Sequence, residues 1–150
     1  MRYLGNKTQL VEFIDEVITK HDIQGETFAD LFAGTASVGD YFKNKYNIIS
    51  NDFMYYSYII SRGKLENNQM PSFTDFTEHY KEDVFSWLNH QKYVPDENYF
   101  TYHSYTPAGG RKFFSEENGI KIDGIRLAIE ELSEKELITE SEYYYLLASL

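Results

Sequence analysis

The residues best suited to bind a small ligand lie in the segment Asp30-Leu31-Phe32-Ala33-Gly34-Thr35-Ala36-Ser37-Val38-Gly39, which combines a carboxylate with glycine and other small residues. Glycine allows the backbone to approach a ligand closely. A helix that begins after such a turn also offers unpaired N–H groups. The segment lacks the G-x-G-x-x-G pattern that a pyrophosphate prefers. We therefore expect a ligand that carries a nucleoside but no phosphate.

A second carboxylate, Asp52, ends the next predicted strand. There it can accept hydrogen bonds from both hydroxyls of a ribose, and each charge-assisted bond of this kind contributes roughly 1.5–3 kcal/mol. The alternative is that Asp52 caps a helix beginning at Phe53. Taken alone, Asp52 fits both interpretations equally. Its position behind the glycine turn favours ribose binding.

The elements that must position these carboxylates come in the order helix, strand, glycine turn, helix, strand, helix. The apolar spacing predicts a helix over residues 7–20, and the next segments predict a strand over 27–32, a helix from the turn to 45, a strand over 46–50 and a helix over 53–65. This order is the start of a doubly wound α/β sheet. We assign residues 1–68 to this part of the fold.

The remainder, residues 69–150, reads as mainly helical. We predict helices over residues 74–90 and 122–132, an irregular stretch over 93–105 and a turn over 107–110. Thr139 and Glu142 form a capping box that opens a last helix. That helix stays apolar to Leu150 without a cap, so we expect the chain to be truncated there, with an exposed edge over 146–150 that favours self-association.

Composition excludes several classes of protein. The net charge of −10 argues against a stand-alone nucleic-acid binder. With no cysteine there is no disulfide or thiolate metal site, and the four histidines lack metal-site spacing. No signal peptide or membrane-spanning run is present in the sequence. We expect a soluble, cytoplasmic protein without metal and without membrane contact.

The N-terminal segment Arg2-Tyr3-Leu4-Gly5-Asn6-Lys7, ahead of the glycine turn, gives the sequence a specific resemblance. In this order the motifs resemble the Dam-like class of adenine-specific DNA methyltransferases of restriction–modification systems, in their N-terminal portion only. The resemblance implies S-adenosylmethionine as cofactor and a partial Rossmann-like methyltransferase fold with a partial helical target-recognition region. It assigns cofactor binding to Tyr3, Lys7, Asp30, Phe32, Gly34 and Asp52, with Asp52 on the ribose.

A later stretch resembles the same class. It comprises Tyr105-Thr106-Pro107-Ala108-Gly109-Gly110-Arg111, Asn118-Gly119 and Ile122-Asp123-Gly124-Ile125-Arg126. The resemblance implies double-stranded DNA as the partner of the complete enzyme, and Arg111 and Lys112 are its candidate contacts. At Ala36 the class often has a second glycine, and alanine fits there if the residue is helical.

The catalytic tetrad of the class, Asp-Pro-Pro-Tyr or a close variant, is absent. None of the three prolines is followed by proline or preceded by aspartate. In the class this tetrad holds an adenine that has been flipped out of the duplex. We therefore assign no catalytic residue and expect the isolated chain to be inactive. The sequence predicts a piece of a DNA adenine N6-methyltransferase, either truncated or one half of a split enzyme that needs a C-terminal partner.

Two other functions stay open. The missing tetrad and the charge of −10 also fit a non-catalytic cofactor-binding or interaction module. A nucleotide-binding α/β protein of another class, such as a small dehydrogenase, is disfavoured by the poor match to G-x-G-x-x-G.

Overall fold

A computed structural model describes residues 7–150, so Tyr3 and the rest of the N-terminal segment before Lys7 lie outside the described residues. The chain divides into two compact units between Met70 and Pro71.

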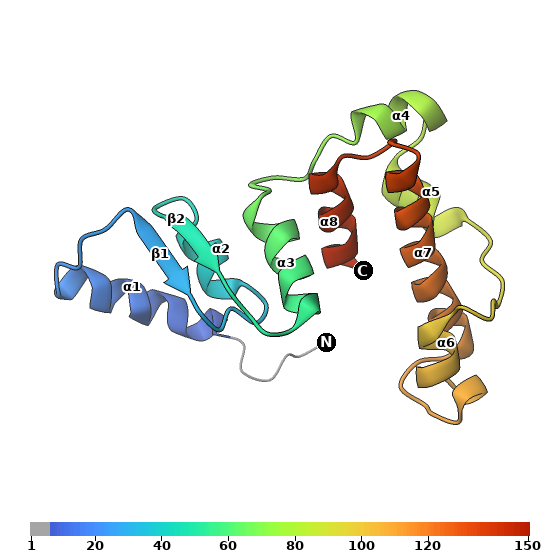
Figure 1. Ribbon diagram of the computed structural model, residues 1–150, viewed down its shortest axis with the longest axis horizontal. Helices are drawn as coiled ribbons and strands as arrows, with labels where there is room; N and C mark the ends of the chain where they lie inside the picture. Colours follow the sequence, from blue (N-terminus) through green and yellow to red (C-terminus); the bar gives the residue numbers. More distant parts are fainter. Residues whose placement is uncertain (1–6) are drawn as a thin grey trace. The chain divides into compact units, whose positions relative to one another are not determined.

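The first unit is built on two parallel strands, β1 (Thr27–Asp30) and β2 (Asn47–Ser50). The helix α2 (Ser37–Phe42) crosses from one strand to the other, and α1 (Val11–Lys20) and α3 (Tyr55–Leu65) flank the strands in sequence. The two arrows of Figure 1 run in the same direction, with Asp30 opposite Ser50 in the register. A short 3₁₀ turn, Thr8–Leu10, precedes α1. The predicted elements are therefore present, with ends shifted by a few residues.

Only one face of this sheet is covered within the described part of the chain. Alternate strand residues point to opposite faces, and Phe28 and Ile48 pack against a core of Val11, Val38 and Phe42 from α1 and α2. The rings of Phe28 and Phe42 stack with their centroids 4.7 Å apart. On the other face Ile49 is 56% exposed. The fold is mixed α/β with a two-stranded parallel sheet, and the doubly wound arrangement remains a prediction.

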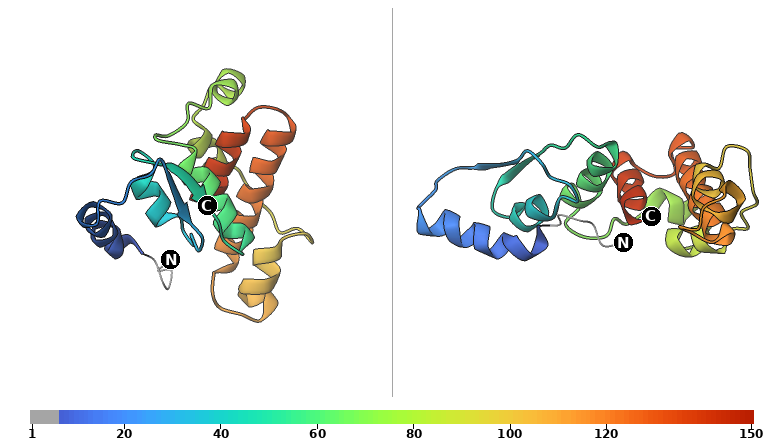
Figure 2. Two further views of the ribbon diagram at one scale, coloured as in Figure 1. Left: turned by 60° about the vertical axis from the view of Figure 1, so that its left-hand side comes forward. Right: turned by 90° about the horizontal axis from the view of Figure 1, so that it is seen from below.

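The second unit is helical. It contains α4 (Thr74–Tyr80), α5 (Val84–His90), α6 (Phe100–Tyr105), α7 (Glu116–Glu134) and α8 (Glu140–Ser149), with a 3₁₀ turn at Pro107–Gly109. Figure 2 shows α7 and α8 side by side. Buried side chains from α4, α5, α7 and α8 form its core, together with Phe73 and Ile138 from the connecting segments.

Three predictions for this unit need correction. The single helix predicted over residues 74–90 is wrong, because Lys81 adopts a left-handed conformation (φ +56°) and Asp83 caps a new helix by accepting a hydrogen bond from Ser86 N–H. The stretch predicted as irregular contains α6, and α7 begins earlier than predicted, at the Ser115 cap. The capping box of Thr139 and Glu142 is confirmed.

The exposed apolar edge predicted over residues 146–150 is wrong for Leu146. This side chain is only 3% exposed and belongs to the core of the second unit, whereas Leu150 is 48% exposed. Most of the apolar run therefore packs in or against the core of the second unit.

Helix α6 is held against α7 by a buried carboxylate. Asp123, 2% exposed, accepts hydrogen bonds from the backbone N–H groups of Thr101 (3.1 Å) and Tyr102 (2.8 Å). These N–H groups lie in the first turn of α6, where they have no acceptor within the helix itself. The contact needs a glycine at position 119, because a Cβ there would lie 2.4 Å from Thr106 Cγ2. The Gly119 and Asp123 motifs noted in the sequence thus dock α6 and the segment that follows it.

This docking predicts that Asp123→Ala destabilises the protein by about 1–3 kcal/mol, since two partly buried N–H groups lose their acceptor. Urea unfolding measures the change. Asp75→Ala removes an exposed carboxylate from the first turn of α4 and serves as the control, with a change below about 1 kcal/mol. Equal stability of the Asp123 variant and the wild type would contradict the docking role.

Candidate functional site

The candidate site lies where β1 and β2 end. Because the strands are parallel, their carboxyl ends meet at the same edge of the sheet. Backbone hydrogen bonds join the two loops that follow: Asn51 N–H donates to Asp30 O (2.8 Å), and Ala33 N–H donates to Asn51 O (2.9 Å). The side-chain amide of Asn51 also donates to Leu31 O at 2.9 Å. The loops are thus fixed relative to each other.

Asp52 connects the second loop to the glycine turn. Its Oδ2 accepts a hydrogen bond from Gly34 N–H (2.8 Å), and its Oδ1 accepts one from Met54 N–H (3.0 Å). Gly34 has φ +54°, a conformation that glycine adopts without strain. The hydrogen bonds from Met54 and then Gly34 lower the pKa of Asp52 below its ordinary value. The carboxylate is therefore ionised at neutral pH.

The alternative role of Asp52 as a helix cap at Phe53 is not what the structure shows. Helix α3 begins at Tyr55, and the residue at its cap position is Met54. Asp52 instead forms a local turn with Met54 N–H and reaches across to the first loop.

Asp30 is buried, with 8% of its surface exposed. Its Oδ1 accepts hydrogen bonds from Lys7 Nζ (3.3 Å) and Phe32 N–H (3.3 Å). Lys7 Nζ also donates to Phe32 O at 2.6 Å, so this lysine is attached to the site and does not extend freely into solvent. The second oxygen, Oδ2, is buried and finds no hydrogen-bond partner within residues 7–150. A buried carboxylate oxygen without a partner can accept a hydrogen bond from a ligand.

Ala36 is not helical, so the condition under which alanine was expected to fit is not met. Ala36 has φ +56° and ψ +22°, in the left-handed region, and is fully buried just before α2. An alanine in this region costs about 1–2 kcal/mol. The turn is retained because it is held from outside: Lys64 Nζ of α3 donates to the carbonyl of Thr35 at 3.0 Å.

Two exposed phenylalanines follow the two carboxylates closely in sequence. Phe32 follows Asp30 by two residues and is 80% exposed, and Phe53 directly follows Asp52 and is 98% exposed. The sequence prediction included Phe32 but missed Phe53. The sequence signal for Phe53 as a further candidate is its position immediately after the predicted ribose-binding aspartate.

The predicted DNA contacts lie in the second unit. Arg111 and Lys112 are exposed and follow the 3₁₀ turn Pro107–Gly109. The Arg111 guanidinium lies over the ring of Tyr105, 5.9 Å from its centroid.

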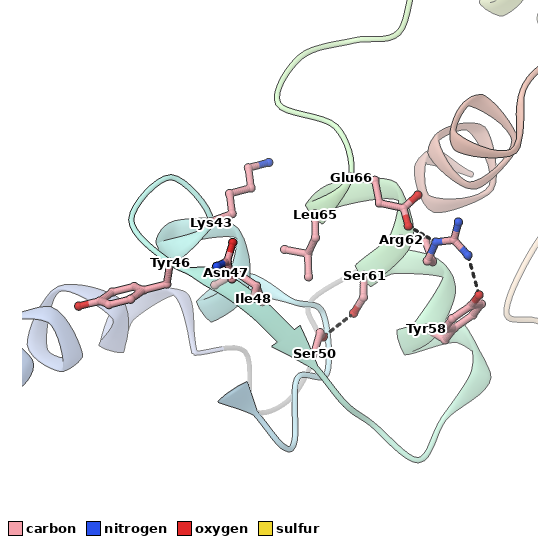
Figure 3. Close-up of a pocket in the computed structure, with 10 residues that line it drawn as sticks. All are labelled: Lys43, Tyr46, Asn47, Ile48, Ser50, Tyr58, Ser61, Arg62, Leu65 and Glu66. Carbon is pink, nitrogen blue, oxygen red and sulfur yellow. Dashed lines mark hydrogen bonds and ion pairs between the residues drawn. The ribbon is translucent and has the colours of Figure 1, made fainter. Parts of the chain in front are cut away.

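A separate pocket of about 390 Å³ lies in the first unit between β2 and α3 (Figure 3). Ser50 and Ser61 share a hydrogen bond of 3.0 Å across it, and Arg62 pairs with Glu66 and Tyr58 along α3. None of the predicted cofactor-binding residues that the structure describes lines this pocket. We assign it no role in the site.

Residues 7–150 contain neither a metal-binding cluster nor a membrane-spanning helix. No group of three or more His, Cys, Asp or Glu side chains there could hold a metal ion. No helix among these residues is both long enough and apolar enough to cross a membrane.

Comparison with known proteins identifies relatives of the whole chain. Residues 3–150 match the family described as D12 class N6 adenine-specific DNA methyltransferase, which confirms the resemblance drawn from the motifs. The chain is 57% identical over 150 residues to modification methylase LlaI of Lactococcus lactis subsp. lactis, covering all of this chain and 24% of the relative. It is 37% identical over 153 residues to type II methyltransferase M.FokI of Planomicrobium okeanokoites, with the same coverages.

A third relative is shorter. Type II methyltransferase M.NlaIII of Neisseria lactamica is 36% identical over 156 residues, covering all of this chain and 44% of the relative. The chain thus spans about a quarter of the first two relatives and less than half of the third. No solved structure matches the chain.

The Asp52 bridge predicts a pH-dependent stability difference between the wild type and Asp52→Asn. Asparagine has one acceptor oxygen for the two N–H groups, so the variant is less stable. Because the folded pKa of Asp52 is lowered, the stabilisation is fully present above the ordinary value of 3.8 and is lost as the pH falls through the folded pKa. Urea unfolding between pH 3 and pH 7 measures the difference, and a gap that widens toward acid would contradict the bridge.

Proposed function

Because the chain belongs to the family of D12 class N6 adenine-specific DNA methyltransferases, we propose that it forms the S-adenosylmethionine-binding part of an enzyme that methylates adenine N6 in double-stranded DNA. A methyltransferase family implies a methyl donor. The observation that carries the proposal is the convergence of Lys7, Asp30, Gly34 and Asp52 at the carboxyl edge of a parallel sheet.

The chemical groups of the site match those of S-adenosylmethionine. S-adenosylmethionine presents an ammonium group and two ribose hydroxyls, which are all hydrogen-bond donors. The site presents two carboxylates, and Asp30 Oδ2 is a buried acceptor with no partner among the described residues. Gly34 and Ala33 carry no large side chain, so the turn leaves room for a ligand near the two carboxylates. The absence of a phosphate on the ligand agrees with the single glycine of the turn.

Each residue then has a distinct part in binding. Asp52 accepts hydrogen bonds from the ribose hydroxyls. Asp30 accepts a hydrogen bond from the ammonium group through Oδ2, while Lys7 holds Oδ1 of Asp30 in place. Phe32 and Phe53 follow these carboxylates closely in sequence, and their exposed rings offer apolar contact to the adenine ring. When bound, S-adenosylmethionine supplies an electrophilic methyl group on its sulfonium, and positioning supplies much of the rate enhancement.

The acceptor half of the reaction is proposed to come from sequence outside this chain. The Asp-Pro-Pro-Tyr tetrad does not occur in it, and the first two relatives are about four times as long. We assign residues 1–68 to the cofactor-binding part and 69–150 to the start of the target-recognition region. The uncovered face of the sheet, with Ile49 exposed, supports completion of a Rossmann-like doubly wound sheet by that further sequence. We place the enzyme in the cytoplasm.

Titration calorimetry with S-adenosylmethionine tests the donor site. Phe53→Ala removes a fully exposed ring, so it should weaken binding without reducing stability. Asp52→Ala should weaken binding by about 10- to 150-fold, the equivalent of one charge-assisted hydrogen bond. Asp75→Ala, an exposed carboxylate of the second unit, is the matched control and should bind as the wild type does. If the wild type and all three variants bound S-adenosylmethionine with equal affinity, the binding site would not lie at this edge of the sheet.

Methyl transfer is tested with a chimera in which this chain replaces the matching segment of the LlaI methylase. The chimera should transfer labelled methyl groups to DNA, and the isolated chain should not. The same chimera carrying Asp52→Ala should lose most activity, and the unaltered LlaI methylase is the positive control. A folded chimera that binds the donor but methylates no DNA would contradict the proposed function.

A further inference from the structure

The second unit carries a cluster of aromatic and basic side chains, all exposed except the half-buried Tyr105, which we call the aromatic–basic loop: Phe100, Tyr105, Arg111, Lys112, Phe113 and Phe114. Phe113 is 70% exposed, Phe100 65% and Phe114 40%. Exposed apolar side chains scattered singly are common, but a contiguous group beside charged residues marks an interaction site.

The backbone of this loop is fixed by hydrogen bonds. Phe113 N–H and Phe114 N–H both donate to Tyr105 O at 3.1 Å, and Arg111 N–H donates to Thr106 O at 3.0 Å. Thr106 is fully buried, and its hydroxyl donates to Tyr102 O at 2.6 Å. The exposed side chains are therefore presented from a preorganised support, which lowers the entropy cost of binding.

The rings contact one another through their edges. Phe113 meets Tyr105 with centroids 5.8 Å apart and planes at 67°, and Tyr105 meets Phe100 at 5.8 Å and 70°. Phe113 is 70% exposed in spite of this contact, so most of its ring surface is accessible to a flat partner. Arg111 rests over Tyr105, 5.9 Å from the ring centroid, and keeps its charge for an anion.

We propose that Phe113 stacks on a base of DNA while Arg111 and Lys112 contact the flanking phosphates. This inference rests on the proposed function and goes beyond it by naming a base-contacting residue. Cations beside an exposed aromatic face are the combination that binds nucleic acid. Glu116 and Glu117 begin α7 just after the loop and would repel phosphate. We therefore place the DNA strand against Arg111, Lys112 and Phe113, away from those two carboxylates.

The test measures binding of the 150-residue chain, at low salt, to a mixed-sequence duplex carrying 2-aminopurine at a mismatch. We expect the wild type to change the fluorescence of 2-aminopurine, as stacking does. Phe113→Ala should weaken binding by about 5- to 150-fold, the range that base–aromatic stacking contributes. Phe113→Tyr should restore the affinity because it keeps a flat ring. Phe13→Ala, which removes a ring 61% exposed on α1, is the matched control and should bind as the wild type does.

The outcomes separate this inference from the proposed function. Absence of DNA binding by the wild-type chain, or equal DNA affinity of Phe113→Ala and wild type, would overturn the stacking role. A wild-type dimer that Phe113→Ala converts to a monomer, without effect on DNA, would assign the loop to protein contact and also overturn it. The affinity of each variant for S-adenosylmethionine should be unchanged, and that measurement tests the donor site independently.

Discussion

The candidate site depends on hydrogen bonds between two loops, and among them the bond from Gly34 N–H to the carboxylate of Asp52 joins the glycine turn to an ionised side chain. It joins a loop that follows β1 to a loop that follows β2, and the parallel sheet holds the start of both. Because Asp52 also accepts Met54 N–H, its two oxygens are both fixed by the backbone. A carboxylate has about four lone-pair positions, so with these two hydrogen bonds made Asp52 can still accept hydrogen bonds from a ligand. The proposed function thus gives one side chain both a structural role and a ligand-binding role.

The first unit could be predicted from the sequence because its signals are local and agree with one another. Strand patterns, the small-residue turn and the carboxylates at the strand ends all indicate the same βαβ order, and the parallel arrangement then brings Asp30, Gly34 and Asp52 together. The attachment of Lys7 to Asp30 spans more than twenty residues and has no local signal. It could be expected only from the resemblance to a known family.

The errors in the second unit have a common cause. Apolar residues over 74–90 keep helical spacing through the break at Lys81, because α4 and α5 both turn their apolar faces to the same core. Nothing in a lysine indicates a left-handed conformation. Likewise, the short helix α6 has little apolar periodicity of its own, and Asp123, more than twenty residues later, holds its first turn. Interactions at this distance in sequence are invisible to pattern analysis.

The left-handed conformation of Ala36 bears on how such proteins are recognised in sequence collections. A search pattern that demands glycine at this position would omit this chain, although its turn has the backbone geometry that a glycine would adopt. The physical requirement is a small side chain that tolerates positive φ in a fully buried place, so alanine satisfies it at modest cost. A pattern written for backbone conformation, admitting glycine or alanine and excluding branched side chains, would describe the turn better than one written for a single amino acid.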